Sequence, residues 1–174
     1  NINNLENDVR KAKQFCKANK VYGAESYISG FSGYVLEILI IYYKSFDNLV
    51  KSASNWQPFH IIDINKIYKN PLQELNKSKI SPLILIDPVQ DDRNTAAALS
   101  LEKFNKFKQA CINYIKRPSD KSFEIKTLNK KELEKQANNN HLILIEANPK
   151  SGKNDVIGSK MLKIFDFIKK QLAL

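Results

Sequence analysis

Residues Val21 to Trp56 read VYGAESYISGFSGYVLEILIIYYKSFDNLVKSASNW, and this stretch decides the fold. Glycine turns around Gly23 and at 30–33 lead into an apolar run, Tyr34 to Tyr43, which is too dense in large side chains to face water. Apolar residues recur in the run at three- and four-residue spacing, and a strand would tolerate Glu37 only at an edge. The run is therefore predicted to be a buried helix.

A second, short helix is predicted directly after this run, over Phe46 to Ala53. Lys44 and Ser45 break the first helix, and Ser45 is a suitable N-cap for the second. Asp47 in the first turn favours the helix dipole. Two neighbouring helices therefore form the centre of the predicted fold.

Short strands are predicted after this helical centre. Phe59 to Ile62 and Leu83 to Ile86 are apolar runs bounded by prolines and aspartates, which is typical of buried strands. His60 lies inside the first run and is expected to be a hydrogen-bonded structural residue rather than a ligand or base. The polar, lysine-rich connection at 65–79 is predicted to lie on the surface, with one helical turn at 72–75.

Two longer helices are predicted on either side. Leu5 to Asn19 has one apolar face, and the spacing of Arg10, Lys13, Lys17 and Lys20 places four cations on a neighbouring face. Thr95 to Lys116 follows Asn94, a good N-cap, and begins with alanines at 96–98, which are strong helix formers. Arg93 would then project from a helix N-terminus, where anions are attracted. An ion pair with Asp87, Asp91 or Asp92 is the structural alternative for this arginine.

A domain boundary is predicted at Arg117-Pro118-Ser119. The residues beyond it alternate between strand patterns, at 123–128 and 141–147, and helix patterns, at 130–137 and near the C-terminus. This order indicates half of a mixed sheet covered by helices. In the last helix, the apolar residues expected to point inward are Ile157, Met161, Ile164, Phe165, Ile168 and Leu172.

The segment ANPKSGKND, at 147–155, has the context of a phosphate loop but not its chemistry. A Walker A loop needs a glycine where Ala147 stands and a serine or threonine where Asn154 stands. An ordinary turn with exposed lysines is the accepted interpretation.

Composition indicates an ordinary globular protein. The chain has 174 residues, of which 43% are hydrophobic and 26% charged. The longest apolar run is far shorter than the roughly 20 residues that a bilayer requires, and the N-terminus has no signal-like apolar region. Cys16 and Cys111 are too few for a disulfide framework and are expected to be small core residues. We therefore expect a cytoplasmic location and no membrane partner.

The net charge of +10 suits a polyanionic partner. Nearly all of the positive charge is lysine, and asparagine is also abundant. An AT-rich genome produces the same bias, so charge alone leaves nucleic acid as one of two explanations.

Two blocks of sequence resemble the archaeal, class I CCA-adding tRNA nucleotidyltransferases. The first consists of YGAE, GFSGY, an apolar run with a YxSF turn, and AxxW, in this order within 22–56; the second is IDPVQDDRNTAAALS at 86–100. The resemblance implies an α+β fold, with a helical central domain of the poly(A) polymerase/OAS-like type at 1–117. It also implies a partial mixed α/β body domain at 118–174.

The resemblance also implies the site. The family's triphosphate-binding lysine and tyrosine fall on Lys13 and Tyr22, and the arginine that contacts the nucleotide and the tRNA end falls on Arg93. Substrates would be CTP and ATP, and tRNA would be the partner, with its backbone on the basic helices and the 121–135 stretch. The chain departs from the family pattern at Ser29, Lys44 and Gln90.

The family's catalytic carboxylates, which hold Mg²⁺, have no match in this sequence. The resemblance therefore implies no catalytic residue here and a nucleotidyltransferase domain supplied in cis or as a separate chain. We expect the chain to be a fragment or the separately encoded C-terminal half of a CCA-adding enzyme. A stand-alone RNA-binding module, or the non-catalytic subunit of a split enzyme, is the alternative, and a homodimer is left open.

Overall fold

The computed structural model describes residues 2–127, 129–137, 145, 147–148 and 151–172. The chain divides into two compact units, Asn1–Ile125 and Lys126–Leu174. The division predicted from the sequence, a central domain at 1–117 and a partial body domain at 118–174, stays a prediction.

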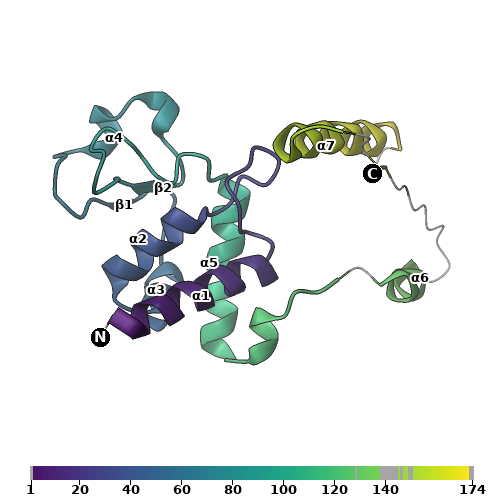
Figure 1. Ribbon diagram of the computed structural model, residues 1–174, viewed down its shortest axis with the longest axis horizontal. Coiled ribbons are helices and arrows are strands. Elements are labelled where there is room, and N and C mark those ends of the chain that lie inside the picture. The colour runs from purple at the N-terminus through teal and green to yellow at the C-terminus, as the bar shows by residue number, and fades with distance from the viewer. Residues whose placement is uncertain (1, 128, 138–144, 146, 149–150, 173–174) are drawn as a thin grey trace. The chain divides into compact units, whose positions relative to one another are not determined.

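The first unit is mainly helical and contains one small sheet (Figure 1). Its elements in chain order are α1 (Ile2–Ala18), α2 (Gly33–Tyr43), α3 (Phe46–Ala53), β1 (His60–Ile62), α4 (Pro71–Glu74), η1 (Lys77–Lys79), β2 (Leu83–Leu85), α5 (Leu101–Lys116) and η2 (Asp120–Phe123). The chain is therefore of the helix-dominated α+β kind, as predicted. The finer assignment to the poly(A) polymerase/OAS-like type stays a prediction.

The two central helices form where the sequence predicts them. α2 is capped by Ser32, whose hydroxyl accepts a hydrogen bond from the Val35 N–H at 3.1 Å, and α3 is capped in the same way by Ser45. Lys44, between them, has a φ of 68° and ends α2 in the left-handed region. A lysine therefore occupies the conformation that a helix C-terminus usually gives to glycine.

The core of the first unit lies where α1 packs against α2, α3 and η2, and α3 packs against α5 (Figure 1). Phe15 of α1 is fully buried, and its ring meets those of Phe46, Phe107, Tyr114 and Phe123 edge-on at 5.5–6.2 Å between centroids. Such aromatic pairs stabilise a core beyond their area burial. Cys16 and Cys111 are buried in the same core, as predicted.

The predicted strands pair in parallel, in the register His60 with Leu83, Ile61 with Ile84 and Ile62 with Leu85. His60 stacks on the buried Trp56 with 5.1 Å between the ring centroids, and its Nε2 lies 3.4 Å from the Tyr43 hydroxyl. Burial lowers the pKa of this histidine. The structural role expected for His60 is confirmed.

The start of the long helix α5 differs from the sequence prediction. α5 begins at Leu101, with Ser100 as its N-cap, and residues 95–98 form a turn. Asn94 is buried and bonds to the backbone of β2 rather than to a helix. The alanines after it therefore lie in a turn, although they are strong helix formers. The prediction that Arg93 projects from a helix N-terminus is therefore wrong.

In the second unit, α6 (Lys130–Ala137) and α7 (Asn154–Gln171) are described, and both helices were predicted. The strand predicted at 123–128 is wrong for its described part, because Phe123 ends the short helix η2 and 124–127 have no regular structure. The strand predicted at 141–147 lies for the most part outside the described residues. Three apolar residues of the last helix that were expected to point inward are exposed: Ile164 at 50%, Phe165 at 61% and Leu172 at 47%.

None of the helices in the described part of the chain is both long enough and apolar enough to span a bilayer.

Candidate nucleotide and RNA-end site

The loop between α1 and α2 positions Tyr22. Tyr22 and Phe31 form an isolated parallel bridge, in which the Gly23 N–H donates to the Phe31 carbonyl and the Phe31 N–H donates to the Val21 carbonyl, both at 2.8 Å. The two segments approach so closely that a Cβ on Gly30 would lie 2.2 Å from the Val21 carbonyl oxygen. Only glycine fits at position 30, and its absence of a side chain lets this loop close.

Lys13 and Tyr22 converge on the first residue of α2. A Cβ built at Gly33 would lie 3.2 Å from the Tyr22 hydroxyl oxygen, 3.4 Å from Lys13 Cε and 3.6 Å from Lys13 Nζ. The two side chains therefore lie across the N-terminal turn of α2. The unpaired N–H groups and the dipole at such a turn favour negative charge, and the lysine adds a full positive charge.

The ammonium of Lys13 is held from the other side by α2 itself. Its Nζ donates to Glu37 Oε1 at 2.7 Å, and the two side chains are 31% and 45% exposed. Because an ammonium has three N–H donors, one bond to Glu37 leaves donors for a further anion. A second cation lies nearby, since Lys17 Nζ sits 5.2 Å from the centre of the Tyr22 ring.

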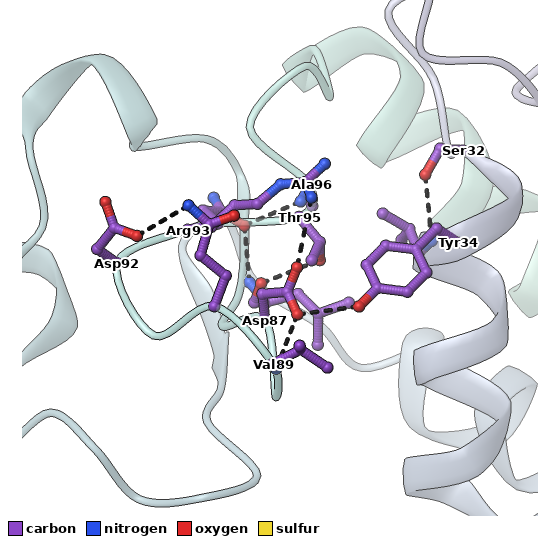
Figure 2. A network of polar contacts seen from close by, with 12 residues as sticks. Ser32, Tyr34, Asp87, Val89, Asp92, Arg93, Thr95 and Ala96 are labelled. Carbon is purple, nitrogen blue, oxygen red and sulfur yellow. Dashed lines mark hydrogen bonds and ion pairs between the residues drawn. The ribbon is translucent and has the colours of Figure 1, made fainter.

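Arg93 reaches the next residue of the same turn. Its guanidinium lies 5.9 Å from the centre of the Tyr34 ring, and its Nη1 lies 3.5 Å from Asp87 Oδ2. Tyr34 in turn donates its hydroxyl to Asp87 Oδ1 at 2.9 Å (Figure 2). The ion pair with Asp87 that the sequence left open for Arg93 is therefore present, while 53% of the arginine side chain stays exposed.

Asn94 fixes the backbone that carries Arg93. Its side-chain oxygen accepts from the N–H groups of Leu85 and Ala96, both at 3.0 Å, and its amide nitrogen donates to the Lys79 carbonyl at 2.9 Å and the Leu83 carbonyl at 3.1 Å. The residue is 3% exposed. One buried amide thus ties the loop to the end of β2.

Burial and hydrogen bonding act in opposite directions on Asp87. Burial raises the pKa of this carboxyl, but hydrogen bonds from the Val89 N–H and the Tyr34 hydroxyl, together with the charge of Arg93, outweigh it and hold the pKa below its ordinary value. The same contact raises the pKa of the Tyr34 phenol, since the phenol donates its proton to a carboxylate. Asp87 is therefore ionised and Tyr34 neutral at neutral pH.

No metal centre is formed by the acidic residues, histidines and cysteines of the described part of the chain. Two of the three acids of the 87–92 loop already have cationic partners: Asp87 pairs with Arg93, and Asp92 pairs with Lys79 at 2.7 Å. These carboxylates do not fit a magnesium site.

The structure thus brings the three predicted site residues to two adjacent positions of one helical turn, Lys13 and Tyr22 at Gly33 and Arg93 at Tyr34. Sequence reasoning missed the roles of Tyr34 and Glu37. A lone acid within an apolar helix was a usable signal for Glu37. Tyr34 gave none, because its partner Asp87 is 53 residues away in the chain.

Comparisons with known proteins identify the family of the chain. Residues 7–124 match the family model described as "tRNA nucleotidyltransferase, second domain". A CCA-adding enzyme of Nanoarchaeum equitans is 53% identical over 108 residues, which are 60% of this chain and 28% of that protein. A CCA-adding enzyme of Methanosarcina mazei is 44% identical over 122 residues, 70% of this chain and 25% of that protein.

A longer match extends beyond the family model. A CCA-adding enzyme of Methanococcus maripaludis is 35% identical over 174 residues, which are 97% of this chain and 39% of that protein. In these three comparisons the chain spans between 25% and 39% of the length of the curated relatives.

Proposed function

The chain belongs to the tRNA nucleotidyltransferase family, whose second domain it contains, and on this basis we propose that it takes part in adding CCA to the 3′ end of tRNA. Its contribution is to bind the triphosphate of CTP or ATP and the acceptor end of the tRNA. The catalytic step belongs to a nucleotidyltransferase domain in cis or in a separate chain.

The observation that carries the proposal is the convergence of Lys13 and Tyr22 on the first turn of α2. A helix N-terminus, an ammonium and a phenol hydroxyl together offer phosphate oxygens several N–H and O–H donors in one place. These groups would neutralise the charge that builds up on pyrophosphate as it leaves.

Arg93 would act on the nucleotide and the RNA end. More than half of its side chain is exposed, and its fork of N–H donors is only partly used by Asp87. A guanidinium suits both phosphate and base edges because its donors lie in one plane. The basic helices and the 121–135 stretch would contact the RNA backbone.

Mg²⁺ would enter with the nucleotide and be held by carboxylates of the nucleotidyltransferase domain. The ion pairs of Asp87 with Arg93 and of Asp92 with Lys79 support this division of labour, since both carboxylates already neutralise a cation of this chain.

Kinetics of CTP incorporation test the phosphate site. In the enzyme assembled with a nucleotidyltransferase domain, and with tRNA lacking CCA, we expect Lys13→Ala to raise the KM for CTP about tenfold and Tyr22→Phe about threefold, the factors for losing a charged and a neutral hydrogen bond. Lys11→Ala is the control on the same helix, because the Lys11 side chain is 61% exposed and its ion pair with Asp8 is long, at 4.0 Å. Unchanged KM in both site variants would remove the assignment.

The stand-alone RNA-binding module is the competing outcome. It predicts that adding the chain to the nucleotidyltransferase domain gives no gain in CTP incorporation over that domain alone, while tRNA still binds. Phosphate contacts require affinity to fall steeply as salt rises. Affinity for tRNA that barely changes with salt would contradict both functions and indicate a structural role.

A further inference from the structure

Asp87 is almost completely buried, and both of its carboxylate oxygens face the Arg93 loop and α2. Its side chain is 3% exposed, Oδ1 accepts from the Tyr34 hydroxyl and from the Val89 N–H at 2.9 Å each, and Oδ2 lies 3.5 Å from Arg93 Nη1. A buried carboxylate is tolerated only when it is paired in this way.

Tyr34 completes a closed set of three contacts (Figure 2). Its hydroxyl bonds to Asp87, Asp87 pairs with Arg93, and the guanidinium of Arg93 lies within cation–π range of the Tyr34 ring, at 5.9 Å from its centre. Tyr34 is the second residue of α2, next to Gly33, on which Lys13 and Tyr22 converge. The contacts therefore link the Arg93 loop to the turn that carries the phosphate site.

The backbone around Arg93 is fixed independently of these contacts. The Asp87 N–H donates to the Arg93 carbonyl at 2.9 Å, the Arg93 N–H donates to the Gln90 carbonyl at 3.0 Å, and Asn94 is anchored in the protein interior. These backbone contacts do not fix the direction of the long arginine side chain. Among the described residues, the guanidinium forms an ion pair only with Asp87 and a cation–π contact only with Tyr34.

We propose that Asp87 is a positioning residue which, together with the hydroxyl of Tyr34, holds the guanidinium of Arg93 against the first turn of α2. Arg93 and the pair of Lys13 and Tyr22 then act on the same bound nucleotide. The identity of that ligand rests on the proposed function. Asp87 engages one nitrogen of the guanidinium, so the remaining donors of Arg93 stay available to the ligand.

The three arginines of the chain, Arg10, Arg93 and Arg117, make this proposal directly measurable. In the ¹⁵N-labelled 174-residue chain, the Nε–H order parameter of Arg93 should exceed that of the exposed Arg117. Asp87→Asn and Tyr34→Phe should both lower the value for Arg93 to that of Arg117. The control Asp92→Asn removes the same charge from the same loop at a side chain that is 69% exposed, and should leave Arg93 unchanged.

Kinetics in the assembled enzyme give the second readout. Asp87→Asn should raise the KM for CTP about tenfold and Tyr34→Phe about threefold, with smaller changes in kcat, because a charged and a neutral hydrogen bond are lost. Tyr27→Phe is the control for the tyrosine. If Asp87→Asn does not fold, as judged from its amide spectrum, Tyr34→Phe decides, since residue 34 is 39% exposed and the substitution keeps its aromatic ring.

The outcomes separate the two proposals. In one outcome, Asp87→Asn and Tyr34→Phe both lower the order parameter of Arg93, but even Arg93→Ala leaves the KM for CTP unchanged. This outcome would support the positioning role and contradict the proposed nucleotide contact. In the other outcome, Arg93→Ala raises the KM for CTP, but Asp87→Asn and Tyr34→Phe leave both the order parameter of Arg93 and the KM at wild-type values. This outcome would overturn the positioning role alone.

Discussion

The two sides of the α2 turn hold their cations in different ways. On the Gly33 side, Lys13 pairs with Glu37, and both side chains are 31–45% exposed. On the Tyr34 side, Arg93 pairs with an aspartate that is 3% exposed and has two further hydrogen bonds. An exposed pair is screened by water and salt and is easily exchanged for another anion, whereas a buried carboxylate fixes its partner. One cation is thus ready to change partner, and the other is held in place.

The largest expected effect tests the rigid side. Asn94→Ala removes the buried amide that ties the Arg93 loop to β2 and leaves buried backbone groups unpaired, so we expect it to lower the free energy of unfolding by about 3 kcal/mol. Urea unfolding followed by the fluorescence of Trp56, the only tryptophan, reports on the first unit. Asn105→Ala, on the exposed face of α5, is the control. If Asn94→Ala lowers the free energy of unfolding by less than about 1 kcal/mol, the Arg93 loop is not fixed more firmly than the Gly33 side.

The corresponding change on the other side is Gly30→Ala. The added methyl group would lie 2.2 Å from the Val21 carbonyl oxygen, so the bridge that positions Tyr22 must open, at a cost of about 2 kcal/mol. The same unfolding experiment measures it, with Ala24→Gly, an exposed change in the same loop, as the control. We expect Arg93 to keep its order in this variant; its loosening would show that the two sides are not separate.

A smaller and opposite effect is expected at the far end of α2. Lys44 has a φ of 68°, so Lys44→Gly should stabilise the first unit by about 1 kcal/mol. Lys51→Gly, inside α3, should destabilise it by a similar amount and shows that loss of a lysine is not the cause. Lys44 follows the end of α2 that is opposite Gly33 and Tyr34, so this stabilisation should leave the KM for CTP unchanged. Destabilisation by Lys44→Gly would contradict the left-handed conformation at this residue.

The smallest effect concerns the exposed pair itself. A double-mutant cycle of Lys13→Ala and Glu37→Ala should give a coupling free energy of about 0.5 kcal/mol that falls in concentrated salt. The cycle of Arg93→Ala and Asp87→Asn should give a larger value that depends less on salt, because Asp87 is buried. Equal coupling in both cycles would remove the contrast between the two sides.

Local sequence signals predicted the elements that depend on local interactions. α2 and α3 begin after serine caps and follow an apolar spacing that lies entirely within the segment, so both were predicted to within one residue. The predicted start of α5 was wrong because Asn94 bonds to residues of β2 and η1 that lie 9 to 15 positions earlier, and a short window of sequence does not show such contacts.

The candidate site, too, could be predicted from the sequence only in part. The resemblance to a known family placed Lys13, Tyr22 and Arg93, and the structure brings these residues to one helical turn. It could not give the partners that orient them, because the contact between Tyr34 and Asp87 joins parts of the chain that are 53 residues apart. Composition and charge suggested only a polyanionic partner.

The segment after α5 has a practical consequence for the size of an independently stable fragment. Gln14 of α1 and Asn19, directly after α1, donate side-chain hydrogen bonds to the Phe123 and Ser122 carbonyls, respectively, and the Phe123 ring packs edge-on against Phe15. A protease cut after Arg117 would strip this cover from α1 and leave an aromatic surface open to self-association. Limited digestion should therefore spare the bond after Arg117 and yield a resistant product that ends beyond Phe123.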